Sequence, residues 1–296
     1  MTGRIVKALS GFYYVYDYAT GIIYACRARG VFRKKNLHPL VGDEAEFVVT
    51  HEHDREGNIE KILPRTSAME RPPVANCDLA LLVTSVHTPD INFSLIDRYL
   101  VCLQHAGLTP VLVFSKSDLN ESDDEAQIRD IYEECGFEMH FISTENGTGI
   151  SDIRETIEGH VSTVAGPSGA GKSSLLNALT GREDLETSEV SGHTGRGRQT
   201  TRHTELVALS SDTFICDTPG FSTVYLPRIK ETKLRDFYPE FVERQEGCRF
   251  RGCAHINEPS CAVKEAVESG QINRTRYENY CRIYDELKEI NRRNYR

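Results

Sequence analysis

The feature that most constrains this chain is a glycine-rich segment that lies between an apolar run and a helical pattern. Residues 166–173 read GPSGAGKS and match GxxxxGK[ST] in full. Residues 160–165 (HVSTVA) favour a strand, and the leucines of residues 174–180 (SLLNALT) have the spacing of a helix face. This context predicts a phosphate-binding loop; the alternative is a glycine-rich turn followed by a chance Lys-Ser pair.

The predicted loop presents several groups to an anion. Its glycines let the backbone curl so that N–H groups face anionic oxygens, and the N-terminus of the following helix adds positive potential. Lys172 is expected to meet the β and γ phosphates of a nucleotide, and the Ser173 hydroxyl is expected to bind Mg²⁺. The nucleotide-binding residues predicted from this segment are Gly166, Pro167, Ser168, Gly169, Ala170, Gly171, Lys172, Ser173 and Ser174.

Composition indicates a reduced, soluble protein with an uneven charge. The nine cysteines are an odd number, which argues against a disulfide framework and suits the cytosol. Neither a signal-peptide pattern nor an apolar window of about 18 residues is evident, so we expect a cytoplasmic protein without a membrane span. The net charge of −9 divides into +2 for residues 1–68, −14 for residues 69–227 and +3 for residues 228–296, which favours an RNA partner at the two flanks over the centre.

Residues 1–68 have the pattern of short strands separated by turns. Aromatic and β-branched residues alternate between glycine-containing breaks, which predicts a five-stranded barrel of the OB type. Aromatic and basic residues on its surface would bind RNA; the alternative is that the aromatic side chains form the barrel core. The residues concerned are Tyr13, Tyr14, Tyr16, Arg27, Arg29, Phe32, Arg33, Lys34 and Lys35. Residues 63–76 contain two adjacent prolines and are expected to be a linker.

Strand and helix patterns alternate after this linker. Residues 78–86 (DLALLVTSV) form a nearly continuous apolar run, which is typical of a strand buried on both faces of a parallel sheet. Further strands are predicted at residues 110–114, 139–142, 160–165, 204–209 and 213–216, and helices at residues 95–103, 123–135, 150–159 and 174–180. The alternation predicts a doubly wound α/β sheet that binds ligands at the carboxyl ends of its strands.

Two loops at predicted carboxyl ends are candidates for reading a base. Ser115, Lys116, Ser117 and Asp118 follow one strand, and Ser143 and Thr144 follow the next. The Asp118 carboxylate could accept the ring N–H and the exocyclic amine of guanine, a donor pair that adenine lacks, while Lys116 could lie along the base. The alternative is a generic loop aspartate.

Two later segments have the features of nucleotide switches. Residues 191–202 (SGHTGRGRQTTR) are glycine-rich and basic, and residues 217–220 (DTPG) follow a predicted strand. The Asp217 carboxylate suits a position linked to Mg²⁺, and the Gly220 N–H could sense a γ-phosphate. These segments and the base-reading loops form a GTPase constellation. In Ras-like chains the base-reading motif comes last, whereas here it precedes the phosphate-binding loop, so the order predicts a circular permutation.

The C-terminal part contains a set of metal-ligand residues. Cys248, Cys253, His255 and Cys261 have the spacing C-x4-C-x-H-x5-C, and three thiolates with one imidazole match a closed tetrahedral structural zinc site. The alternative is reduced cysteines without a metal. Helical patterns flank the set at residues 233–237, 262–269 and 274–293.

Taken together, the chain resembles the RsgA family of circularly permuted GTPases that depend on the small ribosomal subunit. The resemblance covers essentially the whole chain and rests on GPSGAGKSS, GRGRQTTRHTEL, DTPGF, the early SKSD and the four zinc ligands. It implies an OB-type barrel in residues 1–68, a circularly permuted GTPase domain in residues 69–227 and a helical zinc-binding domain in residues 228–296. It also implies GTP hydrolysis stimulated by the small subunit, a role in late maturation of that subunit, and rRNA contacts by the barrel and the zinc domain.

This chain departs from the family pattern at two positions. Ser115 stands where the base-reading motif usually has asparagine, and Gln199 stands where the switch motif usually has histidine. If the family histidine orients the attacking water or docks on the ribosome, Gln199 must take over that role, and a glutamine can position water. Phe221 follows DTPG where Ras-like enzymes have a glutamine, so the sequence leaves the water-positioning residue open. Thr200 or Thr201, together with Ser173 and with Asp217 through water, would organise Mg²⁺.

The sequence leaves two alternatives to a subunit-dependent GTPase. One is a nucleotide-dependent rRNA-binding scaffold whose turnover is incidental, and the other is a P-loop ATPase or kinase. We expect GTP or GDP, Mg²⁺ and one structural Zn²⁺ as ligands, the small subunit and its rRNA as partners, no membrane partner, and a monomer.

Overall fold

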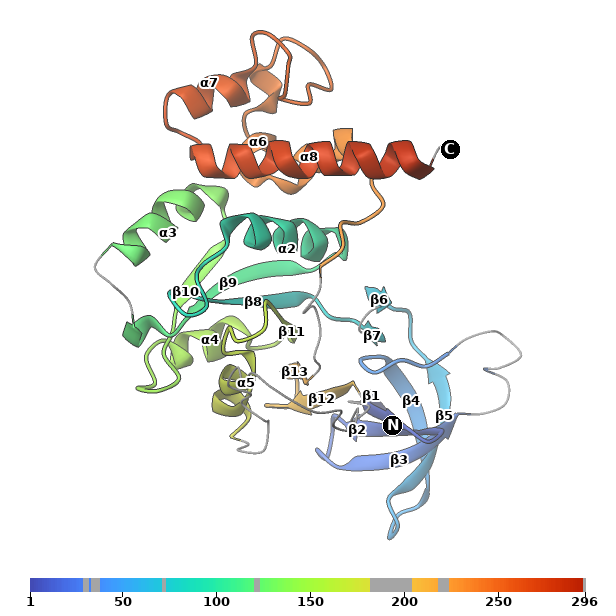
Figure 1. Cartoon of the computed structure of the whole chain (residues 1–296). Helices are drawn as coiled ribbons and strands as arrows, with labels where there is room; N and C mark the ends of the chain where they lie inside the picture. The colour runs from blue at the N-terminus through green and yellow to red at the C-terminus, as the bar shows by residue number, and fades with distance from the viewer. Residues whose placement is uncertain are drawn as a thin grey trace, which may run out of the picture.

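The computed structural model describes residues 1–28, 32, 38–70, 73–119, 123–181, 204–217 and 224–294. Figure 1 shows a β-barrel at one end, an α/β sheet in the middle and a helical part at the other end. This architecture confirms the predicted fold class. No helix in these described ranges combines the length and the apolar character needed to cross a membrane.

The N-terminal barrel has five strands in the order β1-β2-β3-β5-β4, and pairing of β1 with β4 closes it. Its strands are β1 (Thr2–Leu9), β2 (Phe12–Asp17), β3 (Ile23–Ala28), β4 (Glu44–His51) and β5 (Glu56–Ile62). The sequence patterns did not single out β1. A register shift between Ile5 and Lys7 interrupts its pairing with β2, and both faces of β1 are buried, because Ile5 packs in the barrel core and Val6 in the core of the central sheet. A strand of this kind lacks a clean alternation of polar and apolar residues.

The barrel aromatics serve packing, which corrects part of the expected RNA-binding face. Phe32 is only 6% exposed and belongs to the barrel core, and Tyr13 packs against the same core. Tyr14 and Tyr16 pack against the core of the central sheet, where the Tyr16 ring meets Phe214 edge-on at 5.5 Å between ring centres. Burial therefore favours the core alternative for Phe32, while the three tyrosines are half-buried and use part of each ring in packing. Of the basic cluster, Arg27 is exposed and stacks over Phe12, while Arg29, Arg33, Lys34 and Lys35 lie outside the described residues.

The segment expected to be a linker is structured. It contains a small hairpin formed by β6 (Ala68–Glu70) and β7 (Pro73–Ala75). Val74 and Ala75 are fully buried, and the Ala75 N–H donates to the Val41 carbonyl at 2.8 Å. The prediction of a plain linker was wrong because apolar residues beside the prolines pack against the barrel.

The central sheet has the strand order β10-β9-β8-β11-β13-β12, in which β12 alone runs antiparallel to its neighbour in this part of the sheet. Its strands are β8 (Leu79–Ser85), β9 (Thr109–Ser115), β10 (Glu138–Phe141), β11 (Val161–Ala165), β12 (Glu205–Ala208) and β13 (Phe214–Asp217). Strand β9, which leads into the predicted base-reading loop, precedes β11, which leads into the predicted phosphate-binding loop, so the predicted permutation is present in the chain order.

Helices cover both faces of this sheet, as the prediction of a doubly wound fold requires (Figure 1). They are α2 (Phe93–His105), α3 (Asp124–Tyr132), α4 (Ile150–Thr156) and α5 (Lys172–Thr180), with the 3-10 turns η1 (Ser117–Leu119) and η2 (Glu133–Cys135). One apolar cluster includes side chains of α2 and α3, and a second includes those of α4 and α5. Helix α2 begins after Asn92, whose side chain accepts the Leu95 N–H at 3.0 Å, as an N-cap residue does.

Strand β12 joins the central sheet to the barrel. It pairs antiparallel with β1, where Lys7 is opposite Glu205 and the two side chains form an ion pair at 2.9 Å. The barrel and the central sheet are consequently one continuous sheet of 11 strands.

The C-terminal part consists of short helical segments and one long helix. They are η3 (Glu231–Phe237), α6 (Pro239–Val242), η4 (Gln245–Gly247), α7 (Ala262–Glu268) and α8 (Arg274–Asn294). Helix α8 lies alongside α2 (Figure 1), and Val101 of α2 belongs to the apolar cluster of this part. A buried ionic network also crosses this boundary, since Arg276 of α8 contacts both Asp97 of α2 and Glu240 of α6.

Candidate functional site

The segment GPSGAGKS connects β11 to α5 at the carboxyl edge of the central sheet. Gly166, Gly169 and Gly171 all have positive φ angles, of 136°, 79° and 86°. A Cβ at residue 166 would lie 2.0 Å from the Val83 carbonyl oxygen of β8, so only glycine fits there. The loop therefore has the curled backbone that the sequence predicted.

Lys172 begins α5 and turns back toward this loop. Its ammonium donates to the Pro167 carbonyl at 2.6 Å. Burial removes water from the ammonium and lowers the pKa of Lys172. An anion at the loop would oppose this effect, because it stabilises the charged form. The position and the desolvated charge of Lys172 therefore suit a phosphate ligand.

Ser115 links the predicted base-reading loop to the phosphate-binding loop. Its side chain is at the end of β9 and is buried, with its Oγ 2.6 Å from the Ala170 carbonyl and 3.2 Å from the Thr84 carbonyl. The shorter distance assigns its single hydroxyl proton to Ala170. A side chain at residue 171 would crowd this hydroxyl, because a Cβ on Gly171 would lie 3.3 Å from the Ser115 Oγ.

Replacing Ser115 with alanine is expected to lower the free energy of unfolding by about 1–3 kcal/mol, because the Ala170 carbonyl would be left buried without this donor. Urea denaturation measures the change. Ser151→Ala is the matched control, since the Ser151 hydroxyl is exposed and bonds only the neighbouring Asp152. Equal stabilities of the two variants would contradict the role assigned to Ser115.

The two predicted base-reading loops come together at the same edge. The Ser143 hydroxyl donates to the Asp118 carboxylate at 2.5 Å, and the Ser117 N–H donates to the Ile142 carbonyl at 3.0 Å. Thr144 follows Ser143 in the loop after β10 and is partly buried. Asp118 is thus held in place from the adjacent loop rather than by its own.

A third loop, residues 85–89, supports this edge and was missed in the sequence. The Ser85 hydroxyl donates to the Thr88 carbonyl at 2.7 Å, and the Lys116 ammonium donates to the same carbonyl at 2.5 Å. Pro89 reaches the phosphate-binding loop, with its Cδ 3.6 Å from where a Cβ of Gly169 would lie. Only the position of this loop in the sequence could have predicted its role. The loop follows the buried strand β8, and the carboxyl ends of parallel strands share one edge of the sheet.

The predicted switch residues are only partly described. Asp217 ends β13, directly after Cys216, which is in register with Thr163 of β11. Its backbone therefore lies beside the strand that leads into the phosphate-binding loop. The Asp217 side chain, and all of Gln199, Thr200, Thr201 and Gly220, lie outside the described residues.

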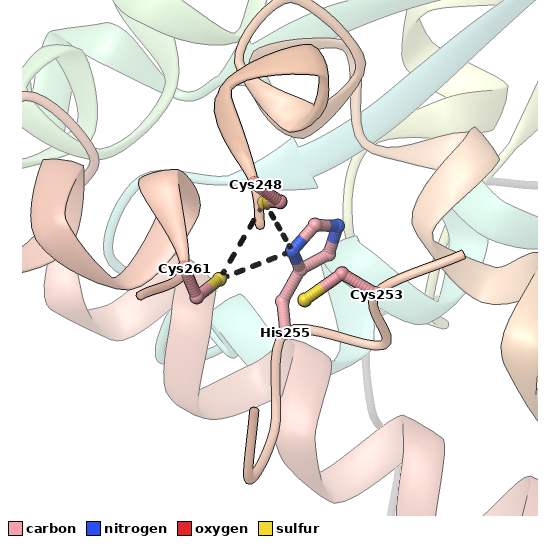
Figure 2. Close-up of side chains that lie close together, drawn as sticks. All are labelled: Cys248, Cys253, His255 and Cys261. Carbon is pink, nitrogen blue, oxygen red and sulfur yellow. Dashed lines mark hydrogen bonds between the residues drawn. The ribbon is translucent and has the colours of Figure 1, made fainter. Parts of the chain in front are cut away.

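The four predicted zinc ligands converge in the C-terminal part (Figure 2). The ligand atoms of Cys248, Cys253, His255 and Cys261 all lie within 4.8 Å of one another. The sulfur atoms of Cys248 and Cys261 are 3.8 Å apart, and His255 Nδ1 is 3.6 Å and 3.3 Å from them. Tetrahedral zinc with Zn–S bonds of about 2.3 Å separates two sulfur ligands by roughly 3.8 Å. The residues therefore fit Zn²⁺ in both donor type and spacing.

Surrounding groups hold the segment that carries His255. The Glu258 carboxylate accepts the backbone N–H groups of residues 254, 256 and 257 at 2.8–3.1 Å, and Tyr277 of α8 donates to the His255 carbonyl at 2.7 Å. Burial lowers the pKa of His255 to about 4, so its imidazole is neutral at physiological pH. The neutral imidazole is the form that ligates a metal.

The comparisons with known proteins agree with this geometry. The family model described as RsgA GTPase matches residues 62–227, and the RsgA N-terminal domain model matches residues 2–59. Small ribosomal subunit biogenesis GTPase RsgA of Agathobacter rectalis is 44% identical over 100% of both chains, and the protein of the same name from Geobacillus sp. strain WCH70 is 47% identical over 97% of each chain.

Solved structures also resemble this chain. The crystal structures of YloQ, a circularly permuted GTPase, and of YjeQ from Thermotoga maritima each match with a TM-score of 0.82 at 35% identity. The matches cover 97% of this chain and 95% and 98% of the respective structures. With the curled phosphate-binding loop, the permuted strand order and the convergent loops, these findings show that the chain belongs to the RsgA GTPase family.

Proposed function

We propose that this protein binds a guanine nucleotide at the carboxyl edge of its central sheet and uses GTP hydrolysis in the maturation of the small ribosomal subunit. The observation that carries the proposal is that the loops after β9, β10 and β11 meet at one edge of the sheet. The Ser115 hydroxyl donates to the Ala170 carbonyl, and the Ser143 hydroxyl donates to the Asp118 carboxylate. The relatives of similar length are named small ribosomal subunit biogenesis GTPases, which supports the same role here. We propose a monomer in the cytoplasm.

Asp118 would select the base. Its Oδ1 accepts the Ser143 hydroxyl, so lone pairs remain on the carboxylate for the ring N–H and exocyclic amine of guanine. Adenine offers no such donor pair. Lys116 would lie along the base, with Ser117 and Thr144 completing the surrounding loops.

The phosphates would lie in the loop of residues 166–174. There the Lys172 ammonium would exchange the Pro167 carbonyl for phosphate oxygens, and the loop N–H groups would face the remaining charge. Ser173, Asp217 and Thr200 or Thr201 would hold Mg²⁺, which supplies charge neutralisation at the β- and γ-phosphate oxygens. Gln199 would orient the attacking water, and the Gly220 N–H would sense the γ-phosphate.

The two proposed switch segments flank one hairpin. Strand β12 follows the first segment, and β13 leads into the second. Because β12 also pairs with β1, a movement of either segment would reach the barrel. We propose domains at residues 1–68, 69–227 and 228–296, with the first and last contacting rRNA and the middle one responding to the nucleotide.

Replacing Lys172 with alanine is expected to reduce single-turnover GTP hydrolysis about 100- to 1,000-fold, because a preorganised charge at the phosphates would be lost. Rapid-quench assays with excess enzyme measure this rate. Lys233→Ala is the control, since Lys233 is largely exposed and lies in the C-terminal part. Unchanged turnover and GTP affinity in the Lys172 variant would exclude the assignment.

Replacing Asp118 with asparagine is expected to shift nucleotide preference from guanine toward xanthine by at least about tenfold, because an amide donates where a carboxylate accepts. The ratio of GDP to XDP dissociation constants, measured by calorimetry, reports the shift. Asp152→Asn on α4 is the exposed control. If ATP competed with GTP equally in the unmodified protein, a P-loop ATPase or kinase would be favoured instead.

Dependence on the ribosome is tested by single-turnover hydrolysis with and without purified small subunits. We expect clear stimulation, together with co-sedimentation that differs between GDP and a nonhydrolysable GTP analogue. Binding without stimulation would favour the rRNA-binding scaffold.

A further inference from the structure

The zinc-ligand loop carries an exposed aromatic side chain between two arginines. Phe250 lies between the ligands Cys248 and Cys253 and is 44% exposed. The Arg249 guanidinium lies over its ring at 5.5 Å from the ring centre, and Arg251 is also exposed. The loop therefore presents an aromatic ring flanked by two cations.

The backbone of this loop is held from several sides. The Cys253 N–H donates to the Phe250 carbonyl, and the Arg249 N–H donates to the Ser260 carbonyl, both at 3.2 Å. Beneath the loop, the Arg235 guanidinium donates to the Cys253 carbonyl at 2.7 Å. Because the backbone is already ordered, a ligand at Phe250 would lose little affinity to ordering of the loop.

The two arginines leave their charge available to a ligand. Neither Arg249 nor Arg251 forms an ion pair with any carboxylate in the described part of the chain. Another aromatic residue, Tyr225, is 81% exposed, but its two neighbours in the sequence are the apolar residues Val224 and Leu226. Exposure of an aromatic ring is thus combined with unpaired positive charge at residues 249–251.

We propose that residues 249–251 bind an unpaired RNA nucleotide, with the Phe250 ring stacked on the base and Arg249 and Arg251 on the adjoining phosphates. Stacking suits any base with a free face, and guanidinium groups bind phosphate. Bases inside an A-form helix are covered by their neighbours, so the site favours a single-stranded loop, bulge or end. The inference rests on the proposed function, because it states how the C-terminal part would contact rRNA.

Binding of the full-length protein to a fluorescein-labelled 12-nucleotide oligouridylate, followed by anisotropy, tests the stacking contact. Phe250→Ala is expected to weaken binding about 5- to 100-fold, whereas Phe250→Tyr keeps the ring and should bind like the unmodified protein. Tyr225→Ala is the matched control and should change nothing. Zinc content and unfolding temperature establish that each variant is folded. Equal affinity of Phe250→Ala and the unmodified protein, or no binding by either, overturns the inference.

Salt dependence tests the phosphate contacts. For single-stranded RNA each lost phosphate contact should reduce the slope of log K against log salt by about 0.7. Arg249→Ala and Arg251→Ala are each expected to show this reduction, and Arg249→Lys to retain the slope. A slope that is the same in all four proteins contradicts the assignment of these arginines.

A photo-crosslinking residue, p-benzoylphenylalanine, at position 250 distinguishes RNA from protein partners on purified small subunits. A crosslink to rRNA supports the inference, whereas a crosslink only to a ribosomal protein, or none, overturns it. Stimulation of GTP hydrolysis by the subunits is measured separately in the unmodified protein. Its absence would count against the proposed function, while loss of RNA binding in Phe250→Ala would still support this site.

Discussion

Replacing Cys261 with alanine is expected to abolish zinc binding and unfold much of the C-terminal part of the chain. Structural zinc contributes on the order of 10 kcal/mol to the folding of small domains. The three ligands that remain in this variant would bind zinc far more weakly than the full set of four. Cys261 is buried and also precedes α7, so the effect should extend into the apolar cluster around it. Metal analysis and far-UV circular dichroism measure the two losses.

The control for this experiment is Cys281→Ala. Cys281 lies on α8, is partly exposed and lies outside the group of four metal-ligand residues. The Cys281 variant should retain about one zinc per chain and the helical signal of the unmodified protein. Purified protein that contains no zinc, yet remains folded in a chelator, would contradict the metal assignment.

Replacing Arg276 with alanine is expected to lower the free energy of unfolding by about 3–5 kcal/mol, because two buried carboxylates would lose their cationic partner. Arg276 is 1% exposed and joins Asp97 of α2 to Glu240 of α6. Asp97 also accepts the Tyr132 hydroxyl at 2.9 Å and the Asn279 amide at 2.6 Å. Urea denaturation with two spectroscopic probes measures the loss.

Arg282→Ala is the matched control for Arg276, since Arg282 lies on the same helix and its side chain is 68% exposed. Its pair with Glu278 should contribute less than about 1 kcal/mol. A loss in Arg276→Ala no larger than in the control would mean that the buried network adds nothing to stability.

This network also bears on how the two ends of the molecule are connected. Helix α2 follows the loop in which Thr88 accepts the Lys116 ammonium, and the same helix carries Asp97. The loops at the carboxyl edge of the central sheet and the C-terminal part are therefore attached to opposite ends of one short segment. A second attachment runs through β12 to the barrel. Both would be available to transmit the response to nucleotide that we propose.

Local patterns predicted most of the elements that build the site. The run of residues 78–86 became β8, and the leucines after Ser173 became the buried face of α5. These predictions succeeded because the periodicity of helices and strands depends only on residues that are close together in the sequence. Strand β1 was missed because its two faces pack against different cores, and the hairpin in residues 68–75 was missed because its prolines suggested a linker.

Side-chain roles that depend on distant partners were harder to predict. Phe32 and Tyr16 stand in an aromatic and basic stretch that is compatible with RNA binding, yet both pack inward. Ser115 looked like a departure from a base-reading motif, and its contact with Ala170 could not be foreseen, because 55 residues separate them along the chain. The contact between Lys116 and the Thr88 carbonyl could not be foreseen for the same reason, because 28 residues separate the two.

The sequence by itself determined the glycine-rich loop between a strand and a helix, the permuted order of motifs and the set of three cysteines and one histidine that fits a metal, because each depends on residue types at short, fixed spacings. Only the tertiary structure decided that β12 fuses the barrel to the central sheet, that Arg276 ties α8 to α2, and that Phe250 is exposed between two arginines that form no ion pair within the described ranges. These features depend on which surfaces meet after folding, and burial of a side chain is set by elements that lie far away in the chain.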